Sequence, residues 1–481
     1  MKKLLLSFVL LTASMMCFAQ SYSSDLVSRA NRGDADAQNL LGTAYYKGDG
    51  ISKDYKKALE WWLKAADQGQ VTAMVNVGNA YLSGWGVATD HMEAAKWYEK
   101  AAKKGSKDGK KYLSWAWNYI GTDYHMGRKG LKQDDSQALK YWKMAAEGGS
   151  STALDNLGNA YSSAWGVEKD YKEATKWYQK AIDTGENAAY RHLGNLYFFG
   201  GYGIEKNYSK AVELYRRAYE KDIKEPSMIN RIAQMYAAGD ASLSKDMNEA
   251  LRWWKVSADK GDWEALSAVA SYYENGYGVP KNLEEAFKWH VKAAEKGSVW
   301  SLNKVANAYY YGSFGQKENP SEAAKWYEKL AKARGTGLDE IMVEDAKEHL
   351  GFMYFDGEGV DKNYEKAFEW FSKCKTNGAK GKLGEMYYNG LYVEKDYNKA
   401  FELLNTAATN MLKVSDKMDM LSENMKKSSF LHSQYGNTMR LLAACYRYGL
   451  GTAKDAEKEK FWMDEAAKHY DDKAKKIIDG K

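Results

Sequence analysis

The side chains that most often carry chemistry are present in this sequence, but their spacing does not arrange them for it. Seven histidines are scattered singly along the 481 residues, and none lies in an H-E-x-x-H or similar metal-binding spacing. No G-x-x-x-x-G-K-[ST] loop occurs, and the GYGVPK stretch that begins at Gly276 does not have the spacing of a phosphate-binding loop. The sequence therefore predicts no metal site and no cofactor.

A serine followed three residues later by a lysine could supply the nucleophile and the base of an enzyme that hydrolyses penicillin-like substrates. Such pairs occur at Ser242/Lys245, Ser301/Lys304 and Ser372/Lys375, among others. No S-D-N or K-T-G motif accompanies them, and in a chain with 70 Lys and Arg residues such pairs arise by chance. We therefore expect no enzymatic activity, and a hydrolase of β-lactam-like substrates is the weakest of three functional hypotheses.

The strongest pattern in the sequence is a repeat. Gly42 and Tyr45 recur 36 positions later as Gly78 and Tyr81, and the string AAKWYEK is written twice. A repeat of this length indicates stacked supersecondary units that share one core. We count eleven units, each marked by a tyrosine three positions after a Gly or Ala: Tyr45, Tyr81, Tyr124, Tyr161, Tyr197, Tyr236, Tyr273, Tyr309, Tyr354, Tyr387 and Tyr446.

Each unit is consistent with a pair of antiparallel helices. In the first helix of the pair, the missing side chain at Gly42 would let a neighbouring helix approach closely, and Tyr45 is expected to fill the space beside it. A Gly-x-Gly turn ends this helix, because glycine reaches the left-handed conformation at low cost. In the second helix, Ala94, Trp97 and Ala101 have the i, i+3, i+7 spacing of a buried stripe.

The second helix of each unit is expected to begin at an Asx N-cap. In five units the Asp or Asn is followed three residues later by Glu, which is the spacing of a capping box. The five pairs are Asp90/Glu93, Asp170/Glu173, Asp246/Glu249, Asn282/Glu285 and Asn319/Glu322. A chain with only three Pro but 37 Tyr and 17 Trp is likewise typical of a helical protein with an aromatic core.

The unit A-x-x-x-L-G-x-x-Y-x-x-G-x-G-V-x-x-D-x-x-K-A-x-x-W-Y-x-K-A-A-x-x-G resembles the Sel1-like repeat, a relative of the tetratricopeptide repeat. The resemblance extends over roughly residues 34 to 470. It implies an all-α fold, a right-handed α/α solenoid that acts as an adaptor or scaffold for other proteins. Proteins of this type are often exported by bacteria, and some cysteine-rich members have been linked to penicillin-like substrates. The paired cysteines of those members are missing here.

The N-terminus resembles a secretory signal peptide. Lys2 and Lys3 precede an apolar run, and Cys17-Phe18-Ala19 offers small residues for cleavage. We therefore predict a signal peptide over residues 1–19, a lead-in over 20–33, and export to the periplasm or the extracellular space. An alternative is a lipid anchor on Cys17, although Met16 is a poor residue before a lipidated cysteine. No later stretch is apolar enough to predict a transmembrane segment.

Residues 34–410 are assigned to repeats one to ten, and 438–481 to the last repeat and a C-terminal cap. Between them, residues 411–437 form a predicted helical insertion with a heptad-like apolar seam. The seam consists of Met411, Val414, Met418, Leu421 and Met425. It either packs on the solenoid or receives a partner. Cys374 and Cys445 fall on core-type positions, and we expect them to be unpaired.

The first helices of tetratricopeptide-like arrays line a concave face, so we place the candidate partner-binding site there. After the small residue lie Asn79, Asn159, Asn195 and Asn307, and after the core tyrosine lie Tyr46, Phe198, Tyr310, Phe355 and Tyr388. Asparagine amides can pair with an extended peptide backbone, and aromatic rings supply contact area. The alternative is that these asparagines are solvated or form hydrogen bonds within the solenoid.

These observations favour an exported scaffold that binds a protein or peptide ligand. Binding of cell-wall or surface glycans is the second hypothesis, because exposed aromatic residues suit sugars as well. The net charge of +6 falls to +4 without Lys2 and Lys3, and acidic and basic residues are interspersed, so nucleic-acid binding is not implied.

Overall fold

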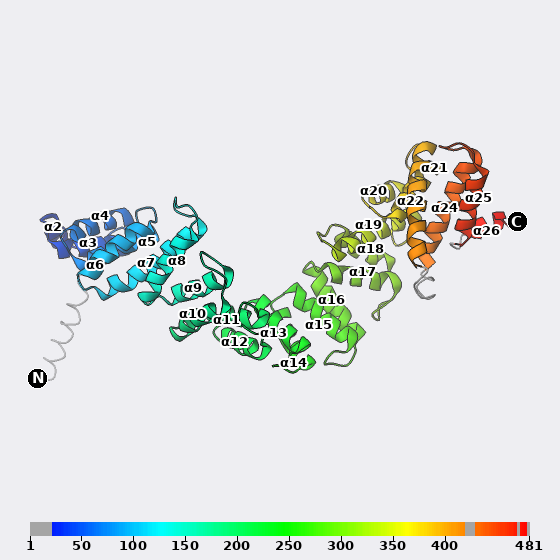
Figure 1. Ribbon diagram of the computed structural model, residues 1–481. Helices are drawn as coiled ribbons and strands as arrows, with labels where there is room; N and C mark the ends of the chain where they lie inside the picture. The colour runs from blue at the N-terminus through cyan, green and yellow to red at the C-terminus, as the bar shows by residue number, and fades with distance from the viewer. Residues whose placement is uncertain (1–21, 419–428, 469–471, 479–481) are drawn as a thin grey trace, which may run out of the picture. The chain divides into compact units, whose positions relative to one another are not determined.

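The computed structural model describes residues 22–418, 429–468 and 472–478, which form 24 helices and no β-strand beyond one isolated bridge between Gly201 and Ile204. Within each of two compact units, consecutive helices pack against each other (Figure 1). The all-helical repeat solenoid predicted from the sequence is confirmed. The chain divides into two compact units, of which the first ends at Lys245 and the second begins at Asp246.

Each repeat contributes two helices. The first helices are α3 (Ala35–Lys47), α5 (Val71–Ser83), α7 (Lys107–Met126), α9 (Ser151–Ser163), α11 (Ala188–Phe199), α13 (Pro226–Ala238), α15 (Trp263–Asn275), α17 (Val299–Tyr311), α19 (Leu338–Asp356), α21 (Asn377–Asn389) and α24 (Ser429–Tyr448). The second helices are α4 (Tyr55–Asp67), α6 (His91–Lys103), α8 (Asp135–Glu147), α10 (Tyr171–Asp183), α12 (Tyr208–Glu220), α14 (Met247–Ala258), α16 (Leu283–Glu295), α18 (Pro320–Ala331), α20 (Tyr364–Ser372), α22 (Tyr397–Met418) and α25 (Ala456–Lys468). Helix α2 (Ser24–Asn31) precedes the repeats and α26 (Asp472–Ile478) follows them.

In each repeat, the second helix begins at an Asx N-cap, as predicted. In all eleven, the side-chain oxygen of the Asp or Asn accepts a hydrogen bond from the backbone N–H three residues later, as Asp90 does from Glu93 at 2.9 Å. This contact satisfies one of the donors that a helix N-terminus leaves unpaired. The five predicted capping positions are therefore confirmed.

The glycines of the first helices make room for a ring, but the ring is not the predicted one. A Cβ atom on Gly42 would lie 2.6 Å from the Trp62 ring of the second helix, so Trp62 fills the space that we assigned to Tyr45. Tyr45 is half-buried instead. We call this contact between a ring of the second helix and a glycine of the first helix the joint. It recurs where Tyr98 covers Gly78, Tyr178 covers Gly158, Tyr215 covers Gly194 and Phe371 covers Gly351.

The predicted stripe on α6 is buried: Ala94 and Ala101 are 0% exposed and Trp97 is 6% exposed. The residue after it, Tyr98, lies deeper at 0% and forms the joint with the first helix. The outer tryptophan is covered by a lysine one turn later, since Lys100 Nζ lies 3.7 Å from the Trp97 ring centroid. Similar Lys-on-Trp pairs occur at Trp61, Trp177, Trp289, Trp326 and Trp370.

The second glycine of the Gly-x-Gly turn joins neighbouring repeats. A Cβ atom on Gly86 would lie 2.5 Å from the carbonyl oxygen of Tyr55, at the start of the second helix of the preceding repeat. Any larger residue would force the turn away from that helix. Turn and helix therefore hold these two repeats together, and the same close approach to a preceding helix occurs at Gly166, Gly278, Gly359 and Gly451.

The irregular segments differ from the standard repeat in length. Helices α7 and α19 have 20 and 19 residues, against 13 in most first helices. Of the predicted seam, Met411 is buried, and the other four residues lie outside the part of the chain whose side chains the structure describes. Cys374 and Cys445 are buried and unpaired, and burial raises the pKa of both thiols to about 11.

Candidate partner-binding site

We define the A-face as three rows of residues on the first helices. Relative to the small residue of each repeat, the rows lie two positions before it, one position after it and five positions after it. Positions separated by seven residues share one side of a helix, so the first and third rows lie in line. The row five positions after the small residue is exposed in all eleven repeats.

The four predicted asparagines all lie in the middle row and are half-buried. Each carboxamide oxygen accepts a hydrogen bond from the tyrosine that covers the first helix of the same repeat. The four pairs are Tyr98 to Asn79 at 2.7 Å, Tyr178 to Asn159 at 2.8 Å, Tyr215 to Asn195 at 2.6 Å and Tyr327 to Asn307 at 2.7 Å. The oxygens thus form hydrogen bonds within the repeat, one of the two alternatives left open by the sequence. Partner binding by these residues stays a prediction.

The Asn–Tyr hydrogen bonds stabilise each repeat because the tyrosines are buried. A buried phenol without a partner would lose its hydrogen bonds to water, and the asparagine oxygen replaces them. Burial raises the pKa of Tyr215 to about 12 and also raises the pKa values of Tyr98, Tyr178 and Tyr327. The phenols therefore remain protonated and act as donors near neutral pH.

Four of the five predicted rings pack against the first residue of their own second helix. Tyr46 contacts Tyr55, Phe198 contacts Tyr208, Phe355 contacts Tyr364 and Tyr388 contacts Tyr397, with ring centroids 5.3–5.7 Å apart. In the eighth repeat that first residue is Pro320, and Tyr310 instead donates a hydrogen bond to Glu358 of the next repeat at 2.8 Å. Phe355 is buried and the other four rings are half-buried.

The large exposed side chains of the A-face lie one position beyond these predicted rings. Met126, Phe199, Tyr311 and Tyr448 occupy the row five positions after the small residue and are 49–61% exposed. The sequence analysis missed them because it took the residue next to the core tyrosine as the outward one. The seven-residue spacing from the row before the small residue could have identified them.

Polar residues connect neighbouring first helices along the A-face. Asn76 donates to Asn39 at 3.0 Å and Asn156 donates to Asn118 at 2.9 Å. The ring nitrogen Nδ1 of His192 lies 2.7 Å from the Asp155 carboxylate. In each pair, a residue of the A-face reaches the preceding repeat, so these side chains also fix the spacing between repeats.

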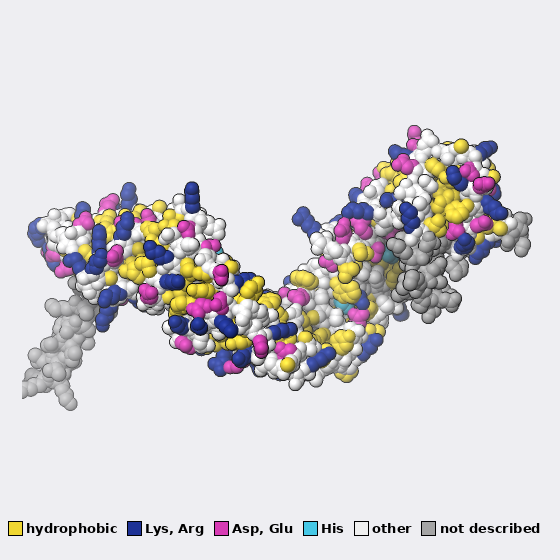
Figure 2. Space-filling view, in the orientation of Figure 1, with side chains coloured by type: hydrophobic (Ala, Val, Ile, Leu, Met, Phe, Trp, Pro, Cys, Tyr) yellow, Lys and Arg dark blue, Asp and Glu magenta, His cyan; other side chains and the backbone are white. Residues whose placement is uncertain are grey.

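The A-face changes in charge along the chain. In repeats two to five its three rows contain no Asp, Glu, Lys or Arg; we call this set the neutral A-face: Asn76, Asn79, Ser83, Tyr119, Thr122, Met126, Asn156, Asn159, Ser163, His192, Asn195 and Phe199. In repeats eight to ten the same rows hold Lys304, Asp356, Lys382 and Glu385; we call this set the charged A-face: Lys304, Asn307, Tyr311, His349, Phe352, Asp356, Lys382, Glu385 and Asn389. Over the rest of the visible surface, both signs of charge are interspersed (Figure 2).

One arrangement has the residue types of a hydrolase. Ser301 Oγ lies 3.1 Å from Nδ1 of His290, whose Nε2 lies 3.3 Å from Glu274. Ser301 is 0% exposed and His290 is 1% exposed, so no substrate can reach the hydroxyl. Burial also lowers the pKa of His290, and Lys304 pairs with Glu274 at 2.8 Å. These contacts join the seventh and eighth repeats and account for the Ser301/Lys304 pair as packing.

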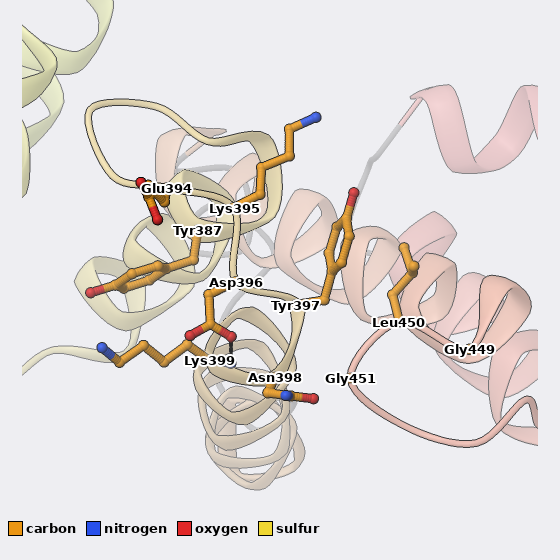
Figure 3. Close-up of a pocket in the computed structure, with 10 residues that line it drawn as sticks. All are labelled: Tyr387, Glu394, Lys395, Asp396, Tyr397, Asn398, Lys399, Gly449, Leu450 and Gly451. Carbon is orange, nitrogen blue, oxygen red and sulfur yellow. Dashed lines mark hydrogen bonds between the residues drawn. The ribbon is translucent and has the colours of Figure 1, made fainter.

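The depressions on the described surface are open to solvent. One of about 600 Å³ lies beside the start of α22, where Tyr397 and Leu450 flank charged side chains such as Lys395 and Lys399 (Figure 3). The carboxylate of Asp396 there is the N-cap of α22 and accepts from the Lys399 backbone at 3.0 Å. Among the described residues, no group of three or more His, Cys, Asp or Glu is placed to hold a metal ion. None of the described helices is long and apolar enough to cross a bilayer.

Comparisons with known proteins agree with this architecture. The Sel1 repeat family matches eleven segments, at residues 35–70, 71–106, 118–150, 151–185, 187–223, 226–262, 263–298, 301–334, 345–374, 379–410 and 437–471. These segments make up most of the chain, so the protein belongs to the Sel1 repeat family. Sel1 repeat proteins are in general scaffolds for protein interactions.

Two solved structures illustrate the similarity. The c5321 protein, a protective antigen present in uropathogenic Escherichia coli strains and displaying an SLR fold, is 29% identical with a TM-score of 0.52, over 92% of this chain and 86% of that one. A Sel1 repeat protein from Oxalobacter formigenes is 30% identical with a TM-score of 0.38, over 53% of this chain and 97% of its own. No curated protein matches the sequence.

Proposed function

We propose that this protein is an exported scaffold that binds a protein or peptide partner through its A-face. The observation that carries the proposal is the exposed row on the first helices, where Met126, Phe199 and Tyr311 are 49%, 61% and 56% exposed. Large apolar side chains cost free energy in water, and they supply most of the binding energy when a partner covers them. In the middle row beside Phe199 and Tyr311 lie Asn195 and Asn307, whose amides can pair with a peptide backbone.

The test compares variants of the immobilised full chain in a capture experiment with envelope extract. Changing Met126, Phe199 and Tyr311 to Ser should abolish capture of the specific partners while the helical content remains unchanged. The matched control changes Tyr277, Tyr392 and Phe461 to Ser; these are 45–55% exposed but lie outside the A-face. Equal loss in both sets, or retained capture by the A-face variant, would reject the proposal.

The asparagines need a separate control, because each one also holds a buried tyrosine. Changing Asn79, Asn159 and Asn307 to Ala removes the amide and the internal hydrogen bond together. Changing Tyr98, Tyr178 and Tyr327 to Phe removes the same hydrogen bond but leaves the amides in place. If the amides contact the partner, only the Asn→Ala set should lose capture.

Export is the second part of the proposal. It is supported by the basic and apolar N-terminal residues and by the similarity to c5321, a protein described as a protective antigen. N-terminal sequencing of the chain isolated from its own cells should begin at Gln20. A retained residue 1 would contradict export by this route, and an acylated Cys17 would favour the lipid-anchored alternative.

Glycan binding is a second candidate function, and one observation favours it. On α7, Trp115 is 42% exposed and Tyr119 46%, and the adjoining neutral A-face offers uncharged amides that can donate to and accept from sugar hydroxyls. A pull-down with peptidoglycan, comparing the unchanged chain with Trp115→Ala, would separate this function from peptide binding. Undiminished retention of the variant would contradict it.

A further inference from the structure

An exposed aromatic surface with two carboxylates lies around Tyr311 and His349 of the charged A-face. We call it the Tyr311 patch and define it by Tyr310, Tyr311, Asp345, His349 and Glu358. Tyr310 and Tyr311 meet edge to face with ring centroids 4.8 Å apart, and Tyr310 meets the His349 ring in the same way at 5.5 Å. The Tyr311 side chain is 56% exposed. The patch thus connects the C-terminal end of α17 to the middle of α19 and to the turn that follows α19.

Hydrogen bonds fix the histidine of the patch as a neutral ring. Its Nδ1 lies 2.8 Å from the backbone carbonyl oxygen of Asp345, an acceptor, so Nδ1 carries the proton. Nε2 then accepts from the Tyr311 hydroxyl at 3.3 Å. Burial lowers the pKa of His349, which keeps the ring uncharged at neutral pH. His349 therefore contributes aromatic surface and no positive charge.

No described Lys, Arg or His forms an ion pair with the two carboxylates of the patch. Among the described residues, no Lys, Arg or His nitrogen lies within 4.0 Å of the Asp345 or Glu358 carboxylate, and Glu358 accepts only the Tyr310 hydroxyl. Desolvation by the surrounding protein, reinforced by Glu344, raises the pKa of Asp345. Burial and the charges of Asp345 and Glu358 raise the pKa of Tyr311. The rings therefore lie in a negative field.

The same chain shows how equivalent positions are filled elsewhere. In the first unit, Arg231 occupies the position that corresponds to His349, one repeat after Phe198 and Phe199. Its guanidinium lies 5.5 Å from the Phe198 ring centroid and 5.2 Å from that of Phe199. In the second unit, Lys304 holds the equivalent place and pairs with Glu274. Between repeats eight and nine, by contrast, the aromatic pair and two carboxylates face the neutral His349.

We infer that the Tyr311 patch binds a lysine or arginine side chain presented by a partner protein segment. This inference rests on the proposed function and specifies the partner chemistry at one part of the A-face. A cation over a tyrosine face is attracted by the ring quadrupole, and two nearby carboxylates complete its neutralisation. The partner's cation would make the contacts that Arg231 makes within the chain.

The test uses ¹⁹F NMR of the full chain with 3-fluorotyrosine at position 311. The probes are ten-residue Gly/Ser peptides whose central residue is Lys, Arg, norleucine or Glu. Lys and Arg peptides should shift the resonance in a saturable way and bind roughly 5- to 30-fold more tightly than the norleucine peptide. Equal binding by norleucine, or no shift with any peptide, would overturn the inference.

Three variants locate the effect. D345N/E358Q removes both charges but keeps an acceptor for Tyr310, and it should abolish the preference for Lys and Arg. D361N/E369Q makes the same change in charge at exposed positions outside the patch and should leave binding unchanged. H349R supplies an internal cation in the place of Arg231 and should block the peptides. Circular dichroism confirms folding of each variant.

Three further outcomes separate this inference from others. If free lysinamide or tetramethylammonium binds as tightly as the Lys peptide, the patch is a small-cation site and the assignment to a protein segment is wrong. If the peptides fail while the A-face variants still lose their captured partner, the scaffold function stands and only the cation assignment is lost. Equal loss in D361N/E369Q would show general electrostatic attraction and would also overturn it.

Discussion

The neutral and charged A-faces are built on the same internal joint but present different chemistry to solvent. In both, an asparagine oxygen accepts from a buried tyrosine: Asn79 from Tyr98 in the first unit and Asn307 from Tyr327 in the second. The outward rows differ, because repeats two to five carry amides, hydroxyls and rings, whereas repeats eight to ten add Lys304, Asp356 and other charges. The joint sets where the rows lie, and the rows are free to vary.

This difference indicates how one repeat fold can bind different segments of a partner. Core positions must satisfy the packing of rings on glycines, so they recur from repeat to repeat. The row five positions after the small residue is exposed in every repeat, so a substitution there changes binding at little cost to folding. The neutral A-face therefore suits uncharged polar groups, and the Tyr311 patch of the second unit suits a cation.

The largest expected effect tests whether the two units share their packing. Gly158→Leu and Gly351→Leu would each place a side chain where the ring of Tyr178 or Phe371 lies. We expect each to destabilise its own unit by about 3 kcal/mol, because overpacking forces the ring or the helix to move. Urea unfolding followed by circular dichroism measures this, with the exposed Ser163→Ala as control. If one substitution left the free energy of unfolding almost unchanged, the two units would not share this packing.

The next effect concerns the shared hydrogen bond. Asn79→Ala and Asn307→Ala should each lower the free energy of unfolding by about 1–2 kcal/mol, since a buried phenol loses its acceptor. Tyr98→Phe and Tyr327→Phe should cost about 1 kcal/mol, and the double variants should cost less than the sum. Strict additivity in the double-mutant cycle would show that the two side chains do not interact.

The third effect depends on pH and tests a buried carboxyl group in the ninth repeat. Glu348 is 8% exposed, burial raises its pKa, and Thr376 donates to it at 2.6 Å. A carboxyl group with a raised folded pKa binds its proton more tightly in the folded state, so stability falls as pH rises from the unfolded value through the folded value. Glu348→Gln should therefore raise the Tm at pH 7.5, and the gain should vanish below about pH 4. A gain that persists in acid would contradict the assignment.

The smallest effect should be equal in the two units. Lys100 and Lys329 lie 3.7 Å and 3.9 Å from the ring centroids of Trp97 and Trp326. Changing either lysine to Met keeps the aliphatic stem but removes the charge, and should cost about 0.5 kcal/mol. Thermal unfolding of the two single variants provides the measurement, and a difference between units would show that the local environment, and not the pair, sets the effect.

Local rules made much of the fold predictable. The Asx N-caps and the Ala94–Trp97–Ala101 stripe depend on residues within one or two turns of each other, and all of them are as predicted. The partner of Gly42 was assigned wrongly because Trp62 lies on another helix, and the sequence does not contain the rotation of one helix against the next. The same missing rotation affected the candidate site. The register placed the candidate residues on the first helices but did not show which of two adjacent positions faces solvent.

By itself the sequence determined the repeat, its eleven copies, the N-caps of the second helices and the family, because periodicity and capping are properties of neighbouring residues. Only the tertiary structure decided that the asparagines hold buried tyrosines, that the exposed row lies one residue further on, and that Tyr311 meets His349 beside two carboxylates with which no described cation pairs. Those facts depend on distances between helices that are 19 to 48 residues apart in the chain. Such distances are set by the packing of rings on glycines, which no local rule specifies.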